Sequence, residues 1–156
     1  DALAVALLEV KGFRREDFAR LHPGGRLGRM LLTKVSDVML TASLPILPAT
    51  ATMREAVVLL AERRGIVLVA GTDAKLLGLL TAGDLTRLME REQDVFAVRV
   101  DAAMVRDPKV ARADELGSAV VYRMEQHGIM AMPVLAADGT IVGVVHLHDL
   151  MRAGAA

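Results

Sequence analysis

KLLGLLTAGDLTRL, residues 75–88, is typical of a short apolar strand that stops at the hydroxyl of Thr81 and turns directly into a helix. A carboxylate, Asp84, lies in the first turn of that helix. A second copy follows at residues 140–152, TIVGVVHLHDLMR, in which glycine, aspartate and leucine recur 65 positions later. Two copies of one strand–helix unit in a single chain indicate an internal duplication.

Composition restricts the classes of protein to consider. The 156 residues suffice for one core or for two small, mutually dependent units. Mean hydropathy is +0.40, but no run reaches the roughly 18 apolar residues of a membrane span, so no membrane partner is expected. Nineteen basic and 19 acidic residues cancel and aromatic residues make up 3%, which disfavours a nucleic-acid partner. The absence of cysteine suits a cytoplasmic protein.

Each copy is expected to belong to a larger repeat with the order β-α-β-β-α. The first repeat spans residues 35–92, with a strand at 45–48, a helix capped by Thr52, two strands around the turn at 71–73, and a second helix. The second repeat spans residues 100–153, and its two-residue changes of register fall in loops. Because each repeat presents one apolar sheet face, the two sheets should pack face to face. The predicted fold class is therefore α/β (α+β), two such repeats packed as a pair.

Residues 1–34 differ from the repeats and are too few for a core of their own. A helix-period segment that Gly12 can end is followed by a second short helix at 14–20. The Pro-Gly-Gly run at 23–25 then requires an irregular turn. We interpret this region as the tail of a larger domain plus a connector.

The repeat resembles the cystathionine β-synthase (CBS) domain. GLLTAGDL at 78–85 is similar to the end of such a domain, VSDVM at 35–39 to its leading segment, and IMAMPV at 129–134 to the central strand of the second copy. The resemblance covers residues 35–153. It implies a regulatory pair that binds adenosyl or other nucleotide ligands in clefts between the repeats.

The flanks resemble a narrower family, the arabinose 5-phosphate isomerases, through HPGGRLGR at 22–29 and HLHDLMRAG at 146–154. In that family a sugar-isomerase (SIS) domain precedes the CBS pair. The enzyme interconverts ribulose 5-phosphate and arabinose 5-phosphate for synthesis of Kdo, the acidic sugar of lipopolysaccharide. The resemblance makes residues 1–34 the short helical tail of a truncated SIS domain with its linker. It also places His22 in the parent active site, whose other residues lie upstream, so this chain alone should not isomerise sugars.

Thr81 and Asp84 form the first candidate ligand site. A hydroxyl beside the free N–H groups of a helix can bind a phosphate, and a carboxylate one turn in can accept both hydroxyls of a ribose. The same two residues can instead form a capping box, and the two roles can coexist. Arg87 and Arg91 follow on this helix, where they either face solvent or meet an anionic ligand.

In the second repeat His146 replaces the threonine, and Asp149 keeps the ribose role that the resemblance implies. An imidazole can still hydrogen-bond, and at roughly pH 6.5 it can carry charge. His146 and His148 point about 200° apart at a helix start, so no metal site is expected. Met132 and Pro133 either offer backbone groups to the ligand or are ordinary strand residues.

The resemblance implies no required cofactor but two candidate regulatory ligands, CMP-Kdo as a downstream product and an adenine nucleotide. The residues themselves do not distinguish cytidine from adenine. The expected partners are this small-molecule nucleotide and a second copy of the chain, giving a homodimer of CBS pairs or a tetramer in the parent protein. An alternative is that the pair acts mainly as an oligomerisation scaffold without bound nucleotide.

Overall fold

The computed structural model describes residues 14, 17, 20–21 and 23–156, and these fall into two compact units. The sheet unit consists of Met39–Arg112 and Ala131–Val145. The helical unit consists of the described residues up to Val38 together with Ala113–Met130 and His146–Ala156. The second sequence repeat contributes to both units, so the units do not coincide with the repeats.

The first repeat supplies a three-stranded sheet to the sheet unit, in the order β1 (Ile46–Pro48), β2 (Ile66–Ala70), β3 (Leu76–Thr81). β1 and β2 run parallel, and β2 and β3 run antiparallel. All five residues of β2 are buried, which is expected for a central strand covered on both faces. The second repeat adds a two-stranded sheet, β4 (Ala131–Leu135) and β5 (Ile141–His146).

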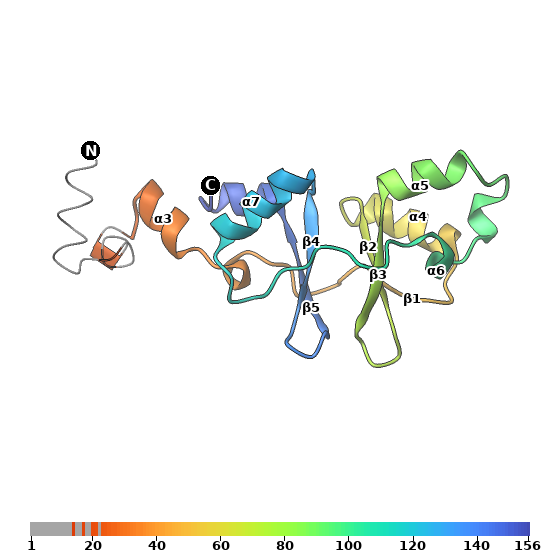
Figure 1. The fold of residues 1–156 in the computed structure, drawn as a ribbon, viewed down its shortest axis with the longest axis horizontal. Helices are drawn as coiled ribbons and strands as arrows, with labels where there is room; N and C mark the ends of the chain where they lie inside the picture. Colours follow the sequence, from red (N-terminus) through yellow and green to blue (C-terminus); the bar gives the residue numbers. More distant parts are fainter. Residues whose placement is uncertain (1–13, 15–16, 18–19, 22) are drawn as a thin grey trace. The chain divides into compact units, whose positions relative to one another are not determined.

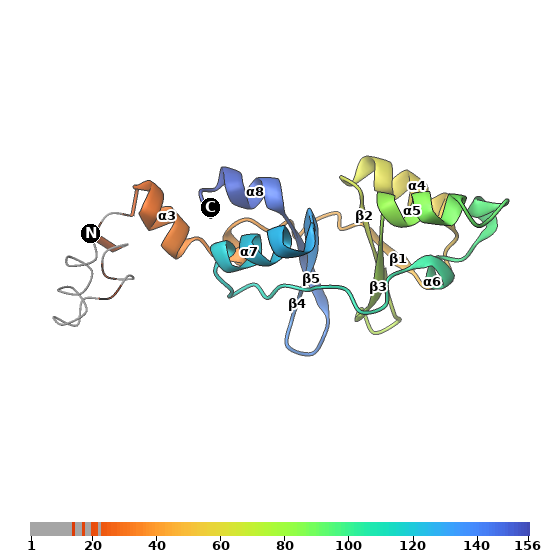
Figure 2. The ribbon, with the colours of Figure 1, turned by 45° about the horizontal axis from the view of Figure 1, so that its top comes forward.

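Helices α4 (Met53–Glu62) and α5 (Ala82–Met89) lie side by side on one face of the β1–β3 sheet (Figures 1 and 2). Helix α4 begins with the predicted cap, in which the backbone N–H of Thr52 donates to Glu55 Oε2 at 2.8 Å. Alternate residues of β2 point to this helical layer. The resulting core contains Met53, Ala56, Leu60, Val67, Val69, Leu80 and Leu88.

The other face of β2 meets the sheet of the second repeat. Ile66 and Leu68 contact Leu79 of β3 and Val144 of β5 in one buried cluster. This cluster confirms the predicted packing of two apolar sheet faces.

The repeats also exchange short backbone segments within the sheet unit. We call residues 39–40 and 104–105 the crossing segments. Leu40 exchanges two backbone hydrogen bonds with Val144 of the second repeat, at 2.8 and 3.0 Å. Val105 exchanges two with Leu79 of the first repeat, at 2.8 and 3.0 Å. Each repeat therefore completes the last strand of the other.

The duplicated glycines lie where these segments cross. A Cβ atom at Gly78 would lie 2.5 Å from the carbonyl oxygen of Val105, and one at Gly143 would lie 2.7 Å from that of Leu40. Glycine is required at both places because only a residue without a side chain allows two backbones to approach this closely. The spacing of 65 residues that marks the duplication thus has a packing cause.

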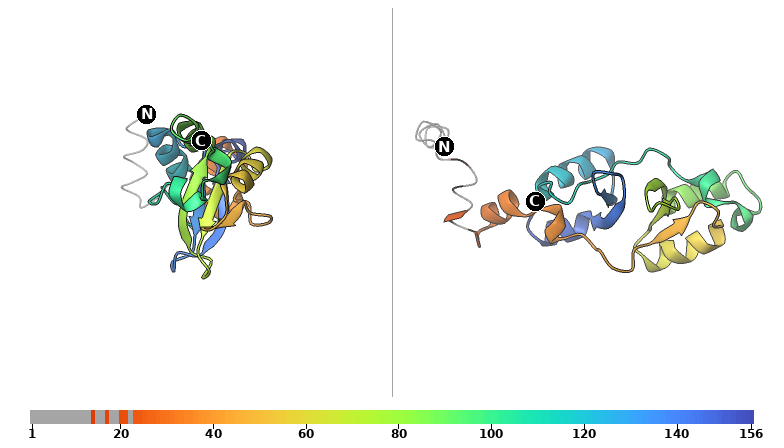
Figure 3. Two further views of the ribbon diagram at one scale, coloured as in Figure 1. Left: turned by 90° about the vertical axis from the view of Figure 1, so that its right-hand side faces the viewer. Right: turned by 90° about the horizontal axis from the view of Figure 1, so that it is seen from below.

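The helical unit contains α3 (Arg26–Leu32), the 3-10 helix η1 (Val35–Asp37), α7 (Gly117–His127) and α8 (Leu147–Arg152). Backbone bonds join its first segment to the start of α7, since Gly117 N–H donates to Thr33 at 2.7 Å. The last residues of the chain lie beside α3 and α7 (Figure 3), and Ala155 is buried there. The short helices α6 (Val100–Ala103) and η2 (Val95–Ala97) belong to the sheet unit.

The second repeat departs from the predicted order at its first strand. Only Ala111 pairs there, in a parallel bridge in which its N–H donates to Pro133 at 2.9 Å and its carbonyl accepts from Leu135 at 3.0 Å. The next bond of a parallel ladder would need the N–H of residue 133, which proline lacks. The strand is therefore reduced to a single bridge.

Two expectations about helices need correction, and a third lies outside the described residues. Helix α5 ends at Met89, three residues before the expected end of the first repeat at residue 92, and α3 occupies a region predicted only as a connector. The helix predicted before Gly12 lies outside the described residues. None of the described helices is both long enough and apolar enough to span a membrane.

Candidate functional site

The first candidate site is built at the junction of β3 and α5. Thr81 is the last residue of β3 and also the N-cap of α5, with an extended backbone (φ −122°, ψ 171°). Small residues, Ala82 and Gly83, form the first turn. The strand therefore delivers Thr81 to the end of the helix that carries unbonded N–H groups.

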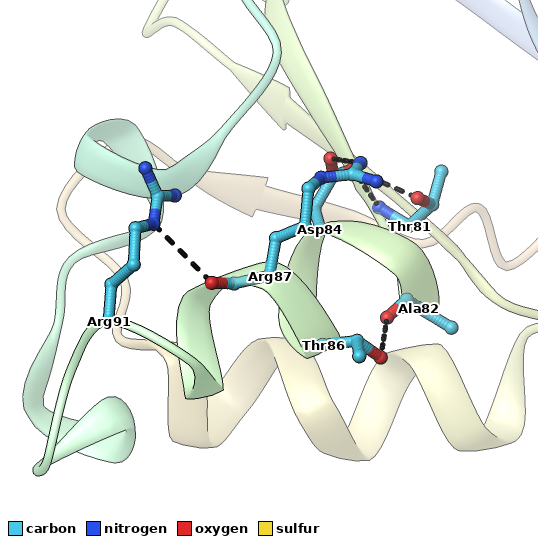
Figure 4. Close-up of polar contacts among 6 residues, drawn as sticks. All are labelled: Thr81, Ala82, Asp84, Thr86, Arg87 and Arg91. Carbon is cyan, nitrogen blue, oxygen red and sulfur yellow. Dashed lines mark hydrogen bonds and ion pairs between the residues drawn. The ribbon is translucent and has the colours of Figure 1, made fainter.

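The carboxylate of Asp84 reaches back to this N-cap. Its Oδ2 atom accepts hydrogen bonds from the backbone N–H of Thr81 at 2.8 Å and from Thr81 Oγ1 at 2.9 Å (Figure 4). Asp84 is only 9% exposed, so its carboxyl group lies at the buried start of a helix. The predicted capping box is present. The same contacts hold Thr81 and Asp84 next to each other, as the ligand hypothesis requires.

Arg87 supplies the third contact of this carboxylate. Its Nη2 lies 2.6 Å from Asp84 Oδ1 (Figure 4), while 65% of the arginine side chain remains exposed. Arg91 extends the row, and its Nε donates to the carbonyl oxygen of Arg87 at 3.4 Å. The sequence analysis placed Arg87 either in solvent or against an anionic ligand, and it did not predict the pair with Asp84. The aspartate–arginine spacing of three on a helix is the signal that could have predicted the pair.

These contacts place a guanidinium beside the first turn of α5. The guanidinium nitrogens of Arg87 lie 3.6 and 3.7 Å from where a Cβ of Gly83 would be, so they sit against the open backbone of that turn. A helix N-terminus favours anions, and a guanidinium can bond a phosphate or carboxylate with two donors. The arrangement can therefore bind an anion beside a carboxylate that accepts hydroxyl hydrogen bonds.

The corresponding junction in the second repeat lies within the helical unit, and two of its side-chain contacts are longer than those in the first. His146 ends β5, caps α8 and is buried, with Nδ1 3.9 Å from Asp149 Oδ2. Arg152 Nη1 lies 4.0 Å from Asp149 Oδ1, and 81% of its side chain is exposed. The substitution of histidine for threonine is thus accompanied by longer contacts to the carboxylate. His148, the other histidine of this junction, lies in the first turn of α8.

The remaining predicted site residues lie elsewhere. Met132 and Pro133 are buried in the middle of β4, and the carbonyl of Pro133 already accepts the N–H of Ala111. Their role in ligand binding stays a prediction. His22 lies outside the described residues.

Two carboxyl groups outside these junctions have a lowered pKa. The hydrogen bond from the Arg99 guanidinium holds the pKa of the Asp101 carboxyl below its usual value, aided by the charges of Arg99 and Arg106. Backbone and side-chain hydrogen bonds from Thr140 likewise lower the pKa of Asp138 in a turn. Both carboxylates stay ionised, and neither touches the candidate site residues.

Comparison with known proteins agrees with this duplicated architecture. Arabinose 5-phosphate isomerase KdsD of Pseudomonas aeruginosa is 43% identical over 156 residues, which cover 99% of this chain and 48% of that protein. The chain thus spans about half the length of the curated relatives it matches.

Solved structures show the same fold at lower identity. CBSX2 in complex with AMP superposes with a TM-score of 0.69 at 22% identity, covering 77% of this chain and 94% of that one. The CBS domain pair of protein MJ0100, in complex with 5′-methylthioadenosine and S-adenosyl-L-methionine, has a TM-score of 0.68 at 21% identity, covering 77% and 94%. The family model of the CBS domain matches residues 35–91 and 98–156. The chain therefore belongs to the CBS domain family, as a tandem pair related to the CBS region of arabinose 5-phosphate isomerases.

Proposed function

We propose that this CBS pair is the regulatory module of an arabinose 5-phosphate isomerase and that it binds a nucleotide or nucleotide sugar. In this proposal residues 1–34 are the end of a SIS domain with its linker, and residues 35–92 and 100–153 are the two regulatory repeats. His22 would then belong to the active site of the parent enzyme, by resemblance to the family. The 43% identity to KdsD supports the enzyme context.

The observation that carries the binding hypothesis is the buried Asp84 carboxylate at the start of α5. It lies beside a threonine hydroxyl, the free N–H groups of the first helical turn and the guanidinium of Arg87. A ribose needs an acceptor for its hydroxyls, and a phosphate needs N–H donors and positive potential. The start of α5 offers both the acceptor for the ribose hydroxyls and the donors for the phosphate. Related folds crystallised with AMP and with S-adenosyl-L-methionine support the same class of ligand.

A thermal-shift screen tests this proposal with CMP-Kdo, CMP, AMP, ATP and arabinose 5-phosphate. A ligand at 100 times its dissociation constant should raise the free energy of unfolding by about 2.7 kcal/mol. We expect a nucleotide or nucleotide sugar to give this rise, and Asp84→Asn to weaken its binding at least ~10-fold, because the uncharged amide is a weaker acceptor for ribose hydroxyls. Calorimetric titration measures the affinity.

Asp73→Asn is the matched control, since it makes the same chemical change in an exposed turn of the sheet unit. It should leave the affinity unchanged. The proposal is wrong if none of these compounds stabilises the chain, or if the two variants bind equally well. A response to the cytidine sugar without AMP would indicate product feedback, whereas a response to adenine nucleotides alone would indicate energy sensing.

A second candidate function, an oligomerisation scaffold, is favoured by apolar side chains on the outer faces of the helices. Val58 on α4 is 53% exposed, and Met89, Tyr122 and Met151 are exposed on α5, α7 and α8. Exposed apolar side chains that form a contiguous patch usually mark an interface. The helices α4 and α5, which carry Val58 and Met89, lie side by side in the sheet unit (Figures 1 and 2). A second copy of the chain is the partner proposed for them.

Sedimentation velocity tests the scaffold directly. We expect the unliganded chain to sediment as a dimer and Val58→Glu to shift it toward the monomer, because a buried unpaired carboxylate opposes association. Leu77→Glu, at a similarly exposed position on β3, should leave the dimer intact. A wild-type monomer at high concentration would contradict this function.

A further inference from the structure

The Asp84 carboxylate is already committed before any ligand binds. Oδ2 accepts two hydrogen bonds from Thr81, and Oδ1 accepts one from Arg87. A ribose that uses the same carboxylate must therefore compete with one of these donors. The Thr81 bonds are part of the buried helix cap, so they are the harder ones to displace.

Arg87 is the donor that can leave. Its side chain is mostly exposed, so water can solvate the guanidinium when it leaves Asp84. Its guanidinium already lies against the first turn of α5, beside the backbone of Gly83. A small rotation about its flexible stem can release Asp84 Oδ1 while the charge stays at the helix N-terminus.

On these grounds, and on the basis of the proposed function, we propose that Arg87 determines the specificity of the first-repeat site by exchanging Asp84 for an anionic group of the ligand. The ribose hydroxyls take the place of the guanidinium at Asp84 Oδ1. The released guanidinium then pairs with the phosphate or carboxylate of the same ligand, with two N–H donors in the geometry that such anions accept.

The exchange disfavours a ligand that lacks an anionic group. A neutral nucleoside can displace Arg87 from Asp84, but it offers the guanidinium no new anion. The nucleoside therefore breaks an ion pair without replacing it, whereas a nucleotide replaces it. Selection of this kind acts against the wrong ligand as well as for the right one.

The second repeat provides an internal comparison. Arg152 stands in the same place relative to Asp149, but its nitrogen lies 4.0 Å away, against 2.6 Å for Arg87. The pair of Arg152 with Asp149 is thus the longer of the two arginine pairs. Discrimination between nucleotide and nucleoside should therefore depend on Arg87 and not on Arg152.

Calorimetric titration of the whole chain with two probe pairs, AMP with adenosine and CMP with cytidine, tests the exchange. In the wild-type chain we expect the nucleotide of at least one pair to bind at least ~10-fold more tightly than its nucleoside. Arg87→Gln should reduce this ratio to about threefold or less, by weakening the nucleotide while the nucleoside binds as well as before or better. Arg152→Gln and Arg91→Gln are matched controls that should keep the wild-type ratio.

The outcomes separate this inference from the function on which it rests. If neither nucleotides nor nucleosides bind the wild-type chain, the inference is wrong, and the proposed function is wrong as well if CMP-Kdo and ATP also fail to bind. If nucleotides bind but Arg87→Gln keeps the wild-type ratio, or if all three variants lower it equally, only the role of Arg87 is wrong. A melting temperature of Arg87→Gln close to that of the wild type verifies that the variant is folded.

Discussion

Leu68→Ala is expected to lower the free energy of unfolding by about 3 kcal/mol. Leu68 is 0% exposed at the centre of β2, where it joins the cluster between the two sheets. Removing its side chain loses the transfer free energy of the buried carbons and leaves a cavity, which together cost roughly 2–5 kcal/mol for leucine. Urea unfolding followed by far-ultraviolet circular dichroism measures the change.

Leu77→Ala is the control for this substitution. Leu77 lies on the adjacent strand β3 with 41% of its surface exposed, so the same truncation removes few buried contacts. We expect a loss of less than about 1 kcal/mol there. Equal losses at the two positions would contradict the assignment of Leu68 to a buried cluster between the sheets.

Gly78→Ala is expected to have the second-largest effect, a loss of about 2 kcal/mol. The added methyl group would meet the Val105 carbonyl oxygen at 2.5 Å and Met104 Sδ at 2.7 Å. The methionine can move, but the backbone of Val105 is held by two hydrogen bonds with Leu79, one to its carbonyl and one from its N–H, so the crossing segment must shift. Overpacking of this kind typically costs roughly 1–3 kcal/mol.

The duplicated position and an open glycine provide the comparison. Gly143→Ala should act in the same direction, because its methyl group would meet the Leu40 carbonyl oxygen at 2.7 Å. Gly24→Ala has no neighbour within 4 Å and should leave the free energy of unfolding unchanged or raise it slightly. If Gly78→Ala is as well tolerated as Gly24→Ala, the close approach of the two backbones at Gly78 is contradicted. Both changes are measured by urea unfolding.

The sequence predicted the repeated part of the fold because the same physical requirement occurs twice. Gly78 and Gly143 each allow a backbone crossing, and Thr52 and Thr81 each cap a helix with an acid three residues later. Such signals are either local in the sequence or repeated at a fixed spacing, so a single sequence reveals them. The face-to-face sheets followed from the apolar strands, and the structure confirms them.

The features that the sequence did not predict depend on tertiary contacts. Helix α3 contains Gly28, which disfavours a helix in isolation, but Gly28 is buried in the structure and Arg29 bonds back to the carbonyl of Gly24. The loss of a strand in the second repeat depends on which residue of β4 meets Ala111, and a register of that kind cannot be read from one strand alone.

Prediction of the candidate site was limited in a different way. The pairing of Thr81 with Asp84 followed from the capping pattern, whereas the contact of Arg87 with Asp84 required a choice of side-chain rotamer. A long exposed arginine has many rotamers, and the sequence does not select among them. The ligand roles of these residues remain predictions that the experiments above test.

The crossing segments also determine when the fold can be completed during synthesis. Val105 follows its partner Leu79 by 26 positions, but Val144 follows Leu40 by 104 positions. A chain growing from its N-terminus must therefore carry the unpaired backbone of Leu40 until Val144 has been made. Contacts of such long sequence separation slow folding, because loop closure must precede the contacts that stabilise it. The pairing of Leu40 with β5, the last strand of the second repeat, is thus the later of the two crossings to form.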